Sequence, residues 1–276
     1  MPKSKLFVRA ACTVLLTLLF SSCKKVIDYI EQHPEAYIPP CRITNYRVSG
    51  GPGAKTNFVV SYDAKGNPIT MMDSDRVNAV GTDQYFRYDK FNRLSDYMQA
   101  YAPATGAIEW DKYAYPRPNY VIDTAMFYET GDVRGPSPIA KNTLEYRISA
   151  YTLDQLGRIV KIWDIPNDSP NTPSLQNTVV YDANGNLPVR YPVLFYDNKV
   201  NPYRTSKTWQ FVYQNYSRNN LEYSIDHFSP QYNVFGLPLT LDNLAFWGFY
   251  PFDQVNLGTE ATIDYACDLP QGPVVY

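Results

Sequence analysis

The sequence predicts an all-β protein, a curved and open antiparallel sheet of consecutive β-hairpins with a short N-terminal helix. Three observations support this prediction. Tyr, Phe, Val and Ile gather in short runs that turn residues interrupt, which is typical of strands. The 25 tyrosines and 13 phenylalanines suit a pleated, half-buried surface. A turn motif with Asp or Asn first, and Gly or Asn three residues later, recurs along the chain.

The chain begins with a basic segment, followed by an unbroken apolar run from Ala10 to Phe20. This order is typical of a secretory signal peptide, and the run is shorter than the roughly 20 residues of a membrane-spanning helix. Two serines then precede Cys23. The segment resembles a bacterial lipoprotein signal, which implies removal of residues 1–22 and lipid on Cys23. The alternatives are an uncleaved helical anchor and a soluble secreted protein that is cut elsewhere.

The lipid that this resemblance implies would attach the protein to a membrane of the cell envelope. Lys24 stands where many inner-membrane lipoproteins have Asp, which favours the outer membrane, with either its periplasmic or its surface face. Removal of residues 1–22 leaves 22 of the 25 basic residues and all 27 acidic ones, a net charge of −5. This balance argues against a nucleic-acid partner, because backbone phosphates need a basic face.

Residues 23–40 are interpreted as the lipid anchor and a tether helix. Three apolar residues fall on one helical face: Val26, Ile27 and Ile30. Pro34 ends this helix. Residues 41–276 are predicted to form a single β-hairpin-repeat domain, because no linker composition divides them. Polar, proline-bearing loops are expected at 164–173 and 197–202.

Two of the four cysteines lie near the ends of the predicted domain, Cys41 at its start and Cys267 close to its end. In an oxidising compartment, the pair could form a disulfide that ties the first strand to the last. The alternative is that each is a separate buried thiol.

Five copies of the turn motif occur. The first residue accepts hydrogen bonds from backbone amides, and the residue three places later takes a positive φ that Gly or Asn tolerates. Apolar residues then resume, so each copy is predicted to be a β-hairpin. The turn residues are Asp63 and Gly66, Asp89 and Asn92, Asp154 and Gly157, Asp182 and Gly185, and Asn233 and Gly236. A degraded sixth copy is expected at 217–220.

In four of the five copies, Tyr precedes the Asp or Asn. These turns resemble the YD or Rhs repeat family, whose core is Tyr-Asp-x-x-Gly-[Arg/Asn]-Leu. The spacing here is irregular, with the aspartates at positions 63, 89, 154 and 182. The resemblance implies a curved sheet of successive hairpins and no chemistry of its own, because activity in that family resides in other modules. The chain is similar to short bacterial lipoproteins that carry such degenerate hairpins.

The sequence contains no catalytic or metal-binding signature, and no cofactor is predicted. The two histidines, His33 and His227, form no zinc-binding spacing, and no Gly-x-Ser-x-Gly motif occurs. A polysaccharide hydrolase that uses paired carboxylates on loops is the alternative function. The candidate acids are Glu109, Asp111, Asp123, Glu145 and Asp164.

The tryptophans Trp110, Trp163, Trp209 and Trp247 lie with many tyrosines in predicted strands. Exposed rings on a sheet can stack on sugar rings, and the alternative is packing in the core and across strands. The apolar run Leu244–Phe252 is interpreted as core. The sequence therefore predicts a non-catalytic, lipid-anchored envelope protein with a binding or structural role, and its predicted partner is a glycan or another envelope protein.

Overall fold

The computed structural model describes residues 39–49, 55–74, 83–100, 106–132, 139–189, 194–223, 230–242 and 260–268. All of them belong to one unit, Pro39–Leu269. The predicted signal peptide, Cys23 and the tether helix lie outside the described residues, as do both histidines, Trp247 and the run Leu244–Phe252.

Strands make up most of the described chain. In chain order they are β1 (Cys41–Ser49), β2 (Lys55–Tyr62), β3 (Pro68–Asp73), β4 (Asp83–Tyr88), β5 (Leu94–Ala100), β6 (Ile108–Arg117), β7 (Tyr120–Asp132), β8 (Ile139–Leu153), β9 (Ile159–Ile165), β10 (Ser174–Thr178), β11 (Leu194–Val200), β12 (Asn219–Tyr223), β13 (Thr240–Asp242) and β14 (Glu260–Cys267). Twelve of them form one sheet in the order β10-β9-β8-β7-β6-β5-β4-β3-β2-β1-β14-β13, and β11 pairs with β12 separately.

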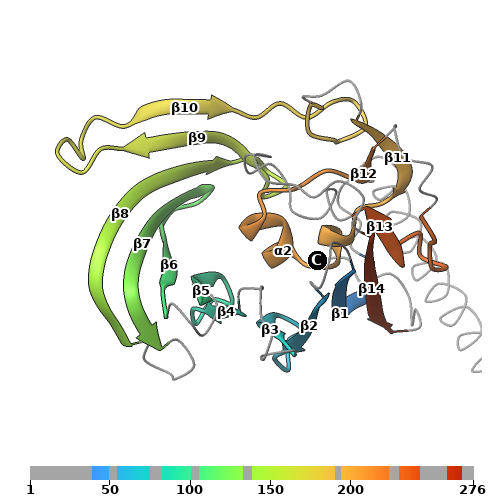
Figure 1. The fold of residues 1–276 in the computed structure, drawn as a ribbon. Helices are drawn as coiled ribbons and strands as arrows, with labels where there is room; N and C mark the ends of the chain where they lie inside the picture. Colours follow the sequence, from blue (N-terminus) through green and yellow to red (C-terminus); the bar gives the residue numbers. More distant parts are fainter. Residues whose placement is uncertain are drawn as a thin grey trace, which may run out of the picture. The chain divides into compact units, whose positions relative to one another are not determined.

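The predicted fold class is confirmed. Strands β1 to β10 pair with their sequence neighbours, and every pairing in the sheet is antiparallel. Strands β10 and β13 are its two edges. Figure 1 shows β7 and β8 bending in an arc whose concave side faces α2 (Lys207–Val212). Register shifts next to the turns, between Ser61 and Tyr62, Arg87 and Tyr88, and Thr152 and Leu153, contribute to this bending.

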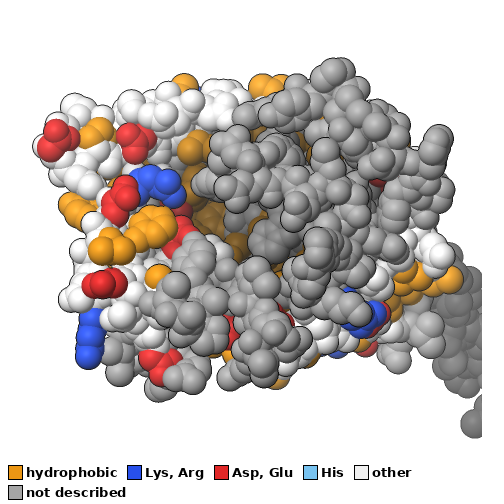
Figure 2. Space-filling view, viewed as in Figure 1, with side chains coloured by type: hydrophobic (Ala, Val, Ile, Leu, Met, Phe, Trp, Pro, Cys, Tyr) orange, Lys and Arg blue, Asp and Glu red, His pale blue; other side chains and the backbone are white. Residues whose placement is uncertain are grey.

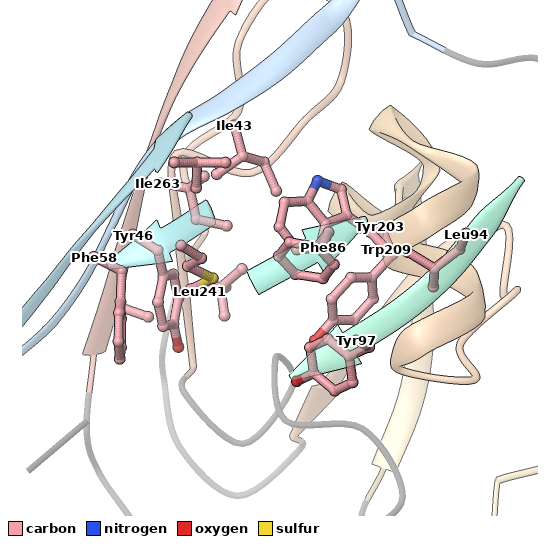
Figure 3. Close-up of a cluster of buried hydrophobic side chains, with 13 residues drawn as sticks. Ile43, Tyr46, Phe58, Phe86, Leu94, Tyr97, Tyr203, Trp209, Leu241 and Ile263 are labelled. Carbon is pink, nitrogen blue, oxygen red and sulfur yellow. The ribbon is translucent and has the colours of Figure 1, made fainter. Parts of the chain in front are cut away.

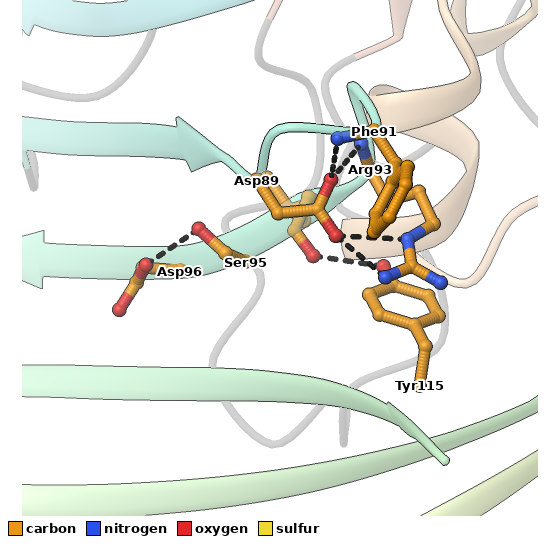
Figure 4. Close-up of polar contacts among 7 residues, drawn as sticks. Asp89, Phe91, Arg93, Ser95, Asp96 and Tyr115 are labelled. Carbon is orange, nitrogen blue, oxygen red and sulfur yellow. Dashed lines mark hydrogen bonds and ion pairs between the residues drawn. The ribbon is translucent and has the colours of Figure 1, made fainter.

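The turn between β4 and β5 shows how the motif works. Oδ1 of Asp89 accepts the backbone N–H groups of Phe91 and Arg93 at 2.8 and 2.9 Å (Figure 4). Asn92 takes a φ of +64°, and the guanidinium of Arg93 pairs with the second oxygen of Asp89 at 2.7 Å. Desolvation by burial is the largest single effect on the pKa of Asp89 and raises it. The hydrogen bonds from Arg93 and Phe91 together outweigh this effect, so the pKa is lowered. The turns between β2 and β3 and between β8 and β9 have the same backbone bonds.

Each of these three turns also accepts a hydrogen bond from a tyrosine on a neighbouring segment. Its hydroxyl donates to the carbonyl of the residue five places after the first turn residue. The donor–acceptor pairs are Tyr88–Pro68, Tyr115–Leu94 and Tyr181–Ile159, at 2.8, 2.8 and 3.0 Å. The turn arginine also lies over the ring, 4.3 Å from the Tyr115 centroid for Arg93 and 4.1 Å from the Tyr181 centroid for Arg158. Each turn is thus held both by its own carboxylate and by the following segment.

The fourth copy differs from the prediction of a β-hairpin. Asp182 accepts the expected backbone N–H groups, and Gly185 takes a φ of +81°. The described residues after this turn, up to position 189, form no strand. Instead, the N–H of Leu187 donates to Oγ of Ser217 at 3.0 Å. Nδ2 of Asn186 donates to Oδ1 of Asn219, and the backbone N–H of Asn219 donates to Oδ1 of Asn186. Long-range polar contacts thus replace a returning strand here.

The fifth copy is flanked by a single bridge between Tyr232 and Pro238, and it leads into β13, which pairs with β14. The expected sixth copy does not form, because 219 and 220 begin β12. The predicted loop at 197–202 is also wrong, since β11 continues to Val200. The expected loop at 164–173 begins two residues late, after Ile165.

A short helical segment interrupts the β structure, and the sequence pattern does not predict it. It consists of the 3-10 helix η2 (Pro202–Thr205) and of α2. The side chains of Asn201 and Ser206 cap the two helices by accepting N–H groups of Tyr203 and Thr208. Trp209 therefore lies on a helix, not on a strand, and its side chain is only 2% exposed.

The main core lies between α2 and the sheet. The ring of Trp209 meets that of Phe86 edge-on, with the centroids 5.1 Å apart, and both pack with Tyr203, Leu241 and Ile263 (Figure 3). The disulfide between Cys41 and Cys267 joins β1 to β14 at one border of this core. Closure of a loop of 226 residues stabilises the folded state by about 2–4 kcal/mol.

The positive φ of Gly157 in the third turn should make this position sensitive to substitution. Gly157 has a φ of +78°, and nothing lies within 4 Å of where its Cβ would be. Gly157→Val should therefore lower the free energy of unfolding by about 1–2 kcal/mol through backbone strain alone. Gly157→Asn should cost less, because Asn92 adopts this conformation in the second turn. Urea denaturation measures both, and equal losses for Val and Asn would contradict this explanation.

Candidate functional site

The sheet between β5 and β10 has two distinct faces, and contacts with α2 identify them. Tyr113 of β6 and Tyr151 of β8 meet Phe211 of α2 edge-on, with centroids 5.0 and 5.9 Å apart. Side chains alternate along a strand, so the neighbours of these tyrosines point away from α2. Trp110 of β6 therefore lies on the opposite face, as does Trp163 of β9, whose Nε1 donates to Thr152.

Large apolar side chains follow the strand register across this opposite face. One row runs from Met98 through Trp110 and Met126 to Tyr146, and another runs from Ile122 through Ala150 and Trp163 to Leu175. The side chains of Tyr146 and Leu175 are 44% and 49% exposed, and both tryptophans are half-buried. We name this surface the aromatic face and define it by Trp110, Tyr128, Tyr146, Ile148, Trp163 and Leu175.

Hydrogen bonds hold both indole rings of the aromatic face in place. Nε1 of Trp110 donates to Oδ1 of Asp96 at 2.9 Å, and Nε1 of Trp163 donates to Oγ1 of Thr152 at 3.1 Å. The second oxygen of Asp96 accepts the hydroxyl of Ser95 at 2.7 Å (Figure 4). Because the polar edge of each indole is satisfied within the sheet, its ring is oriented before any ligand arrives.

A lysine accompanies each tryptophan. Nζ of Lys112 lies 4.0 Å from the ring centroid of Trp110, and Nζ of Lys161 lies 5.9 Å from that of Trp163. Both lysines are exposed. Figure 2 shows hydrophobic side chains next to basic and acidic ones on the side where β7, β8 and β9 lie in Figure 1. The surface thus combines apolar rings with positive charge.

The α2-facing side carries a different cluster, built around two buried acids. Asp111 and Asp123 lie on the adjacent strands β6 and β7, and both are 7% exposed. Oδ2 of Asp123 accepts the hydroxyl of Tyr151 at 2.9 Å. Nε2 of Gln214 donates to that hydroxyl at 3.3 Å, so the residues after α2 contact this cluster.

Burial makes the ionised forms of these two acids unfavourable. It raises the pKa of Asp111 well above its usual range, and the charges of Asp123 and Glu109 add to this shift while Arg147 opposes it. Burial also raises the pKa of Asp123 to about 6, against the hydrogen bond from Tyr151 and the charge of Arg147. The pair therefore resists holding two negative charges.

The structure places all five candidate acids on strands, where the alternative function expected carboxylates on loops. Strand alternation and register bring them to the same α2-facing side: Glu109 and Asp111 on β6, Asp123 on β7, Glu145 on β8 and Asp164 on β9. They differ in access, because Glu145 is exposed and Glu109 and Asp164 are half-buried. Only Asp111 and Asp123 are buried as a pair.

A further acidic cluster, which the sequence analysis does not include, joins the fifth turn to the β11–β12 ladder. The hydroxyl of Tyr232 lies 2.6 Å from Oδ2 of Asp197 and 2.8 Å from Oε1 of Glu222. The hydroxyl has a single proton to share between the two carboxyl groups. Burial raises the pKa of Glu222, and the neighbouring charge of Asp197 adds to the shift. The spacing of these residues in the sequence gives no signal of this contact.

Among the residues that the structure describes, no group of three or more His, Cys, Asp or Glu side chains is placed to hold a metal ion. Within the same ranges, no helix has the length and apolar character needed to cross a membrane. The binding and catalytic candidates of the described chain are therefore the aromatic face and the two acidic clusters.

No protein-family model matches the sequence, and a search of curated proteins finds no match. Among solved structures, the chain is similar to a porin-like protein from Bacteroides vulgatus, with a TM-score of 0.38 and 14% identity over 81% of this chain and 98% of that one. Structures at this TM-score need not share a fold, so this similarity assigns no function here. The resemblance to the YD or Rhs family stays a prediction.

The acid pair predicts a pH-dependent stability difference. The pKa of Asp123 is higher in the folded protein, about 6, than in an unfolded chain, about 3.9. Its contribution to stability is therefore fully present below pH 4 and is lost as the pH rises through 6. Asp123→Asn should avoid this loss, so the variant should gain about 1–3 kcal/mol over the wild type between pH 4 and pH 8.

Urea denaturation at a series of pH values measures this difference. Glu145→Gln is the matched control, because the side chain of Glu145 is exposed on the same side of the sheet and its difference from the wild type should stay flat. A difference for Asp123→Asn that does not change with pH would contradict the role given to burial.

Proposed function

We propose that this chain is a cell-envelope lipoprotein, anchored by lipid at Cys23, whose aromatic face binds an extracellular glycan without transforming it. The observation that carries the binding role is the pair of oriented, half-buried tryptophans on the face opposite α2. An exposed apolar patch with polar groups at its border is typical of an interaction site.

Trp110 and Tyr128 pack against a smaller buried cluster of Tyr85, Met98 and Ile108, so part of this face belongs to a second core. Packing against α2 does not account for the accessible remainder. The core tryptophan, Trp209, is buried against α2 and the inner side of the sheet, whereas Trp110 and Trp163 project from the other side. Leu144, also on β8, is 67% exposed. The apolar rings can stack on the C–H faces of sugars, and the lysines and Asp96 at their edges can meet sugar hydroxyls.

Two observations support the lipid anchor, the signal-like N-terminal sequence and the disulfide of the folded chain. The signal-like segment ends in Cys23, and the disulfide between Cys41 and Cys267 suits an exported protein, because disulfides persist in oxidising compartments. The proposed location is the outer membrane, because Lys24 stands where many inner-membrane lipoproteins have Asp.

A second candidate function is the hydrolysis of a polysaccharide. The observation that favours it is the pair of Asp111 and Asp123, since raised pKa values are typical of catalytic acids. Their burial and the hydrogen bond of Asp123 to Tyr151 fit a structural role at least as well. The binding role is therefore the primary proposal, and release of reducing ends from a bound polymer would favour the hydrolase instead.

Loss of the tryptophan rings should abolish binding. Affinity electrophoresis of the detergent-solubilised full chain against a panel of soluble polysaccharides should show retardation by at least one polymer. Trp110→Ala combined with Trp163→Ala should weaken this retardation at least tenfold, because each stacked ring contributes about 1–3 kcal/mol in comparable ring stacking.

Phe91→Ala is the matched control, since Phe91 is an aromatic residue with 66% exposure that lies in a turn outside the aromatic face. Equal losses in the control and in the double variant would argue against the aromatic face. Capture of an envelope protein, together with no retardation by any polymer, would replace the glycan by a protein partner.

The anchor makes a separate prediction. Cells that express the full chain and grow with an alkyne-labelled fatty acid should label it, and Cys23→Ser should abolish the label. Cys12→Ser is the control, because Cys12 lies inside the apolar run and should be removed with it. Label that persists in Cys23→Ser would contradict the lipid anchor.

A further inference from the structure

We propose that the glycan bound by the aromatic face is anionic, and that Lys112 and Lys161 pair with its acidic groups while Trp110 and Trp163 stack on its rings. This inference rests on the proposed glycan-binding function and names the chemical class of the ligand.

The two Trp–Lys pairs repeat with the same orientation. Each pair is separated by two positions on its strand, so both side chains of a pair lie on one face. Strands β6 and β9 run in opposite directions, and the order of the pair is reversed between them, Trp110 before Lys112 but Lys161 before Trp163. In space, each lysine therefore lies on the same side of its tryptophan.

The register places the four residues in successive rows across the sheet. Lys112 is level with Thr124 and Ile148, one row beyond Trp110, and Trp163 is level with Ile122 and Ala150 in the next row. Lys161, level with Thr152, follows in the last row. The two Trp–Lys pairs therefore lie three strand spacings apart, about 14 Å across the sheet, and are offset by two rows along the strands. This repeat of a ring beside a charge suits a polymer that repeats a sugar ring and an acidic group.

The ammonium groups are available for an anion. Within the described part of the chain, neither lysine forms an ion pair. Asp96 is the cross-strand partner of Lys112, but its two oxygens accept Trp110 and Ser95 instead. An exposed cation–π contact is weak, whereas an ammonium–carboxylate hydrogen bond is strengthened by charge, so each lysine can turn from its ring toward a bound anion.

The charge of the whole protein gives no general attraction to acidic polymers, because its formal net charge is −2. Binding of an anionic glycan would therefore depend on these local lysines. This dependence separates the proposal from non-specific ion exchange.

The test compares one polymer with and without its charge. Polygalacturonate and its fully methyl-esterified form are run in affinity electrophoresis with the detergent-solubilised full chain. The acidic polymer should bind at least tenfold more tightly than the ester, and Lys112→Gln with Lys161→Gln should weaken binding of the acidic polymer until the two affinities are equal. The wild-type affinity for the acidic polymer should also fall as salt rises.

Lys90→Gln is the matched control, because Nζ of Lys90 lies 5.0 Å from the ring of Phe91 in a turn outside the aromatic face. It should leave both affinities unchanged. Equal binding of both polymers, or no effect of the double lysine variant, would overturn the anionic ligand while leaving the glycan-binding function intact. Absence of binding to either polymer and to the wider panel would overturn the proposed function itself.

Discussion

Three hairpins of the sheet depend on one interaction, the acceptance of two backbone N–H groups by a carboxylate at the start of the turn. In the second turn, Asp89 holds Phe91 and Arg93 in this way, and the left-handed residue Asn92 returns the chain. The turn and its adjacent bulge set the strand register. A slip of one residue would exchange the two faces of a strand, so this local interaction decides which side chains meet α2.

The strand register therefore gives the two faces of the sheet different side chains. On the α2 side, aromatic rings close a core around Trp209, and the same side receives the buried acids Asp111 and Asp123. On the other side, Trp110 and Trp163 remain partly accessible, each with a lysine over its ring. Burial raises the pKa values of the two acids on the α2 side, whereas both tryptophans on the opposite side are only half-buried.

Much of this fold could be predicted from the sequence, and particular residues show where prediction stops. Between Val121 and Ala125, alternating burial in the strand is readable from the residue pattern. The helix that carries Trp209 is not, because six residues are too few to show a helical period and its Trp, Phe and Val are also typical of strands. The five acids could be named in advance, but nothing in their spacing indicated that acids on four different strands lie on one face of the sheet.

The sequence by itself determined the hairpin turns at Asp63, Asp89 and Asp154, because each carboxylate closes its turn through contacts within five residues. Only the tertiary structure decided that Cys41 meets Cys267, that the fourth turn leads to Ser217 instead of a strand, and that two tryptophans face away from α2. These outcomes depend on register accumulated over many strands and on contacts between residues far apart in the chain, which no local pattern encodes.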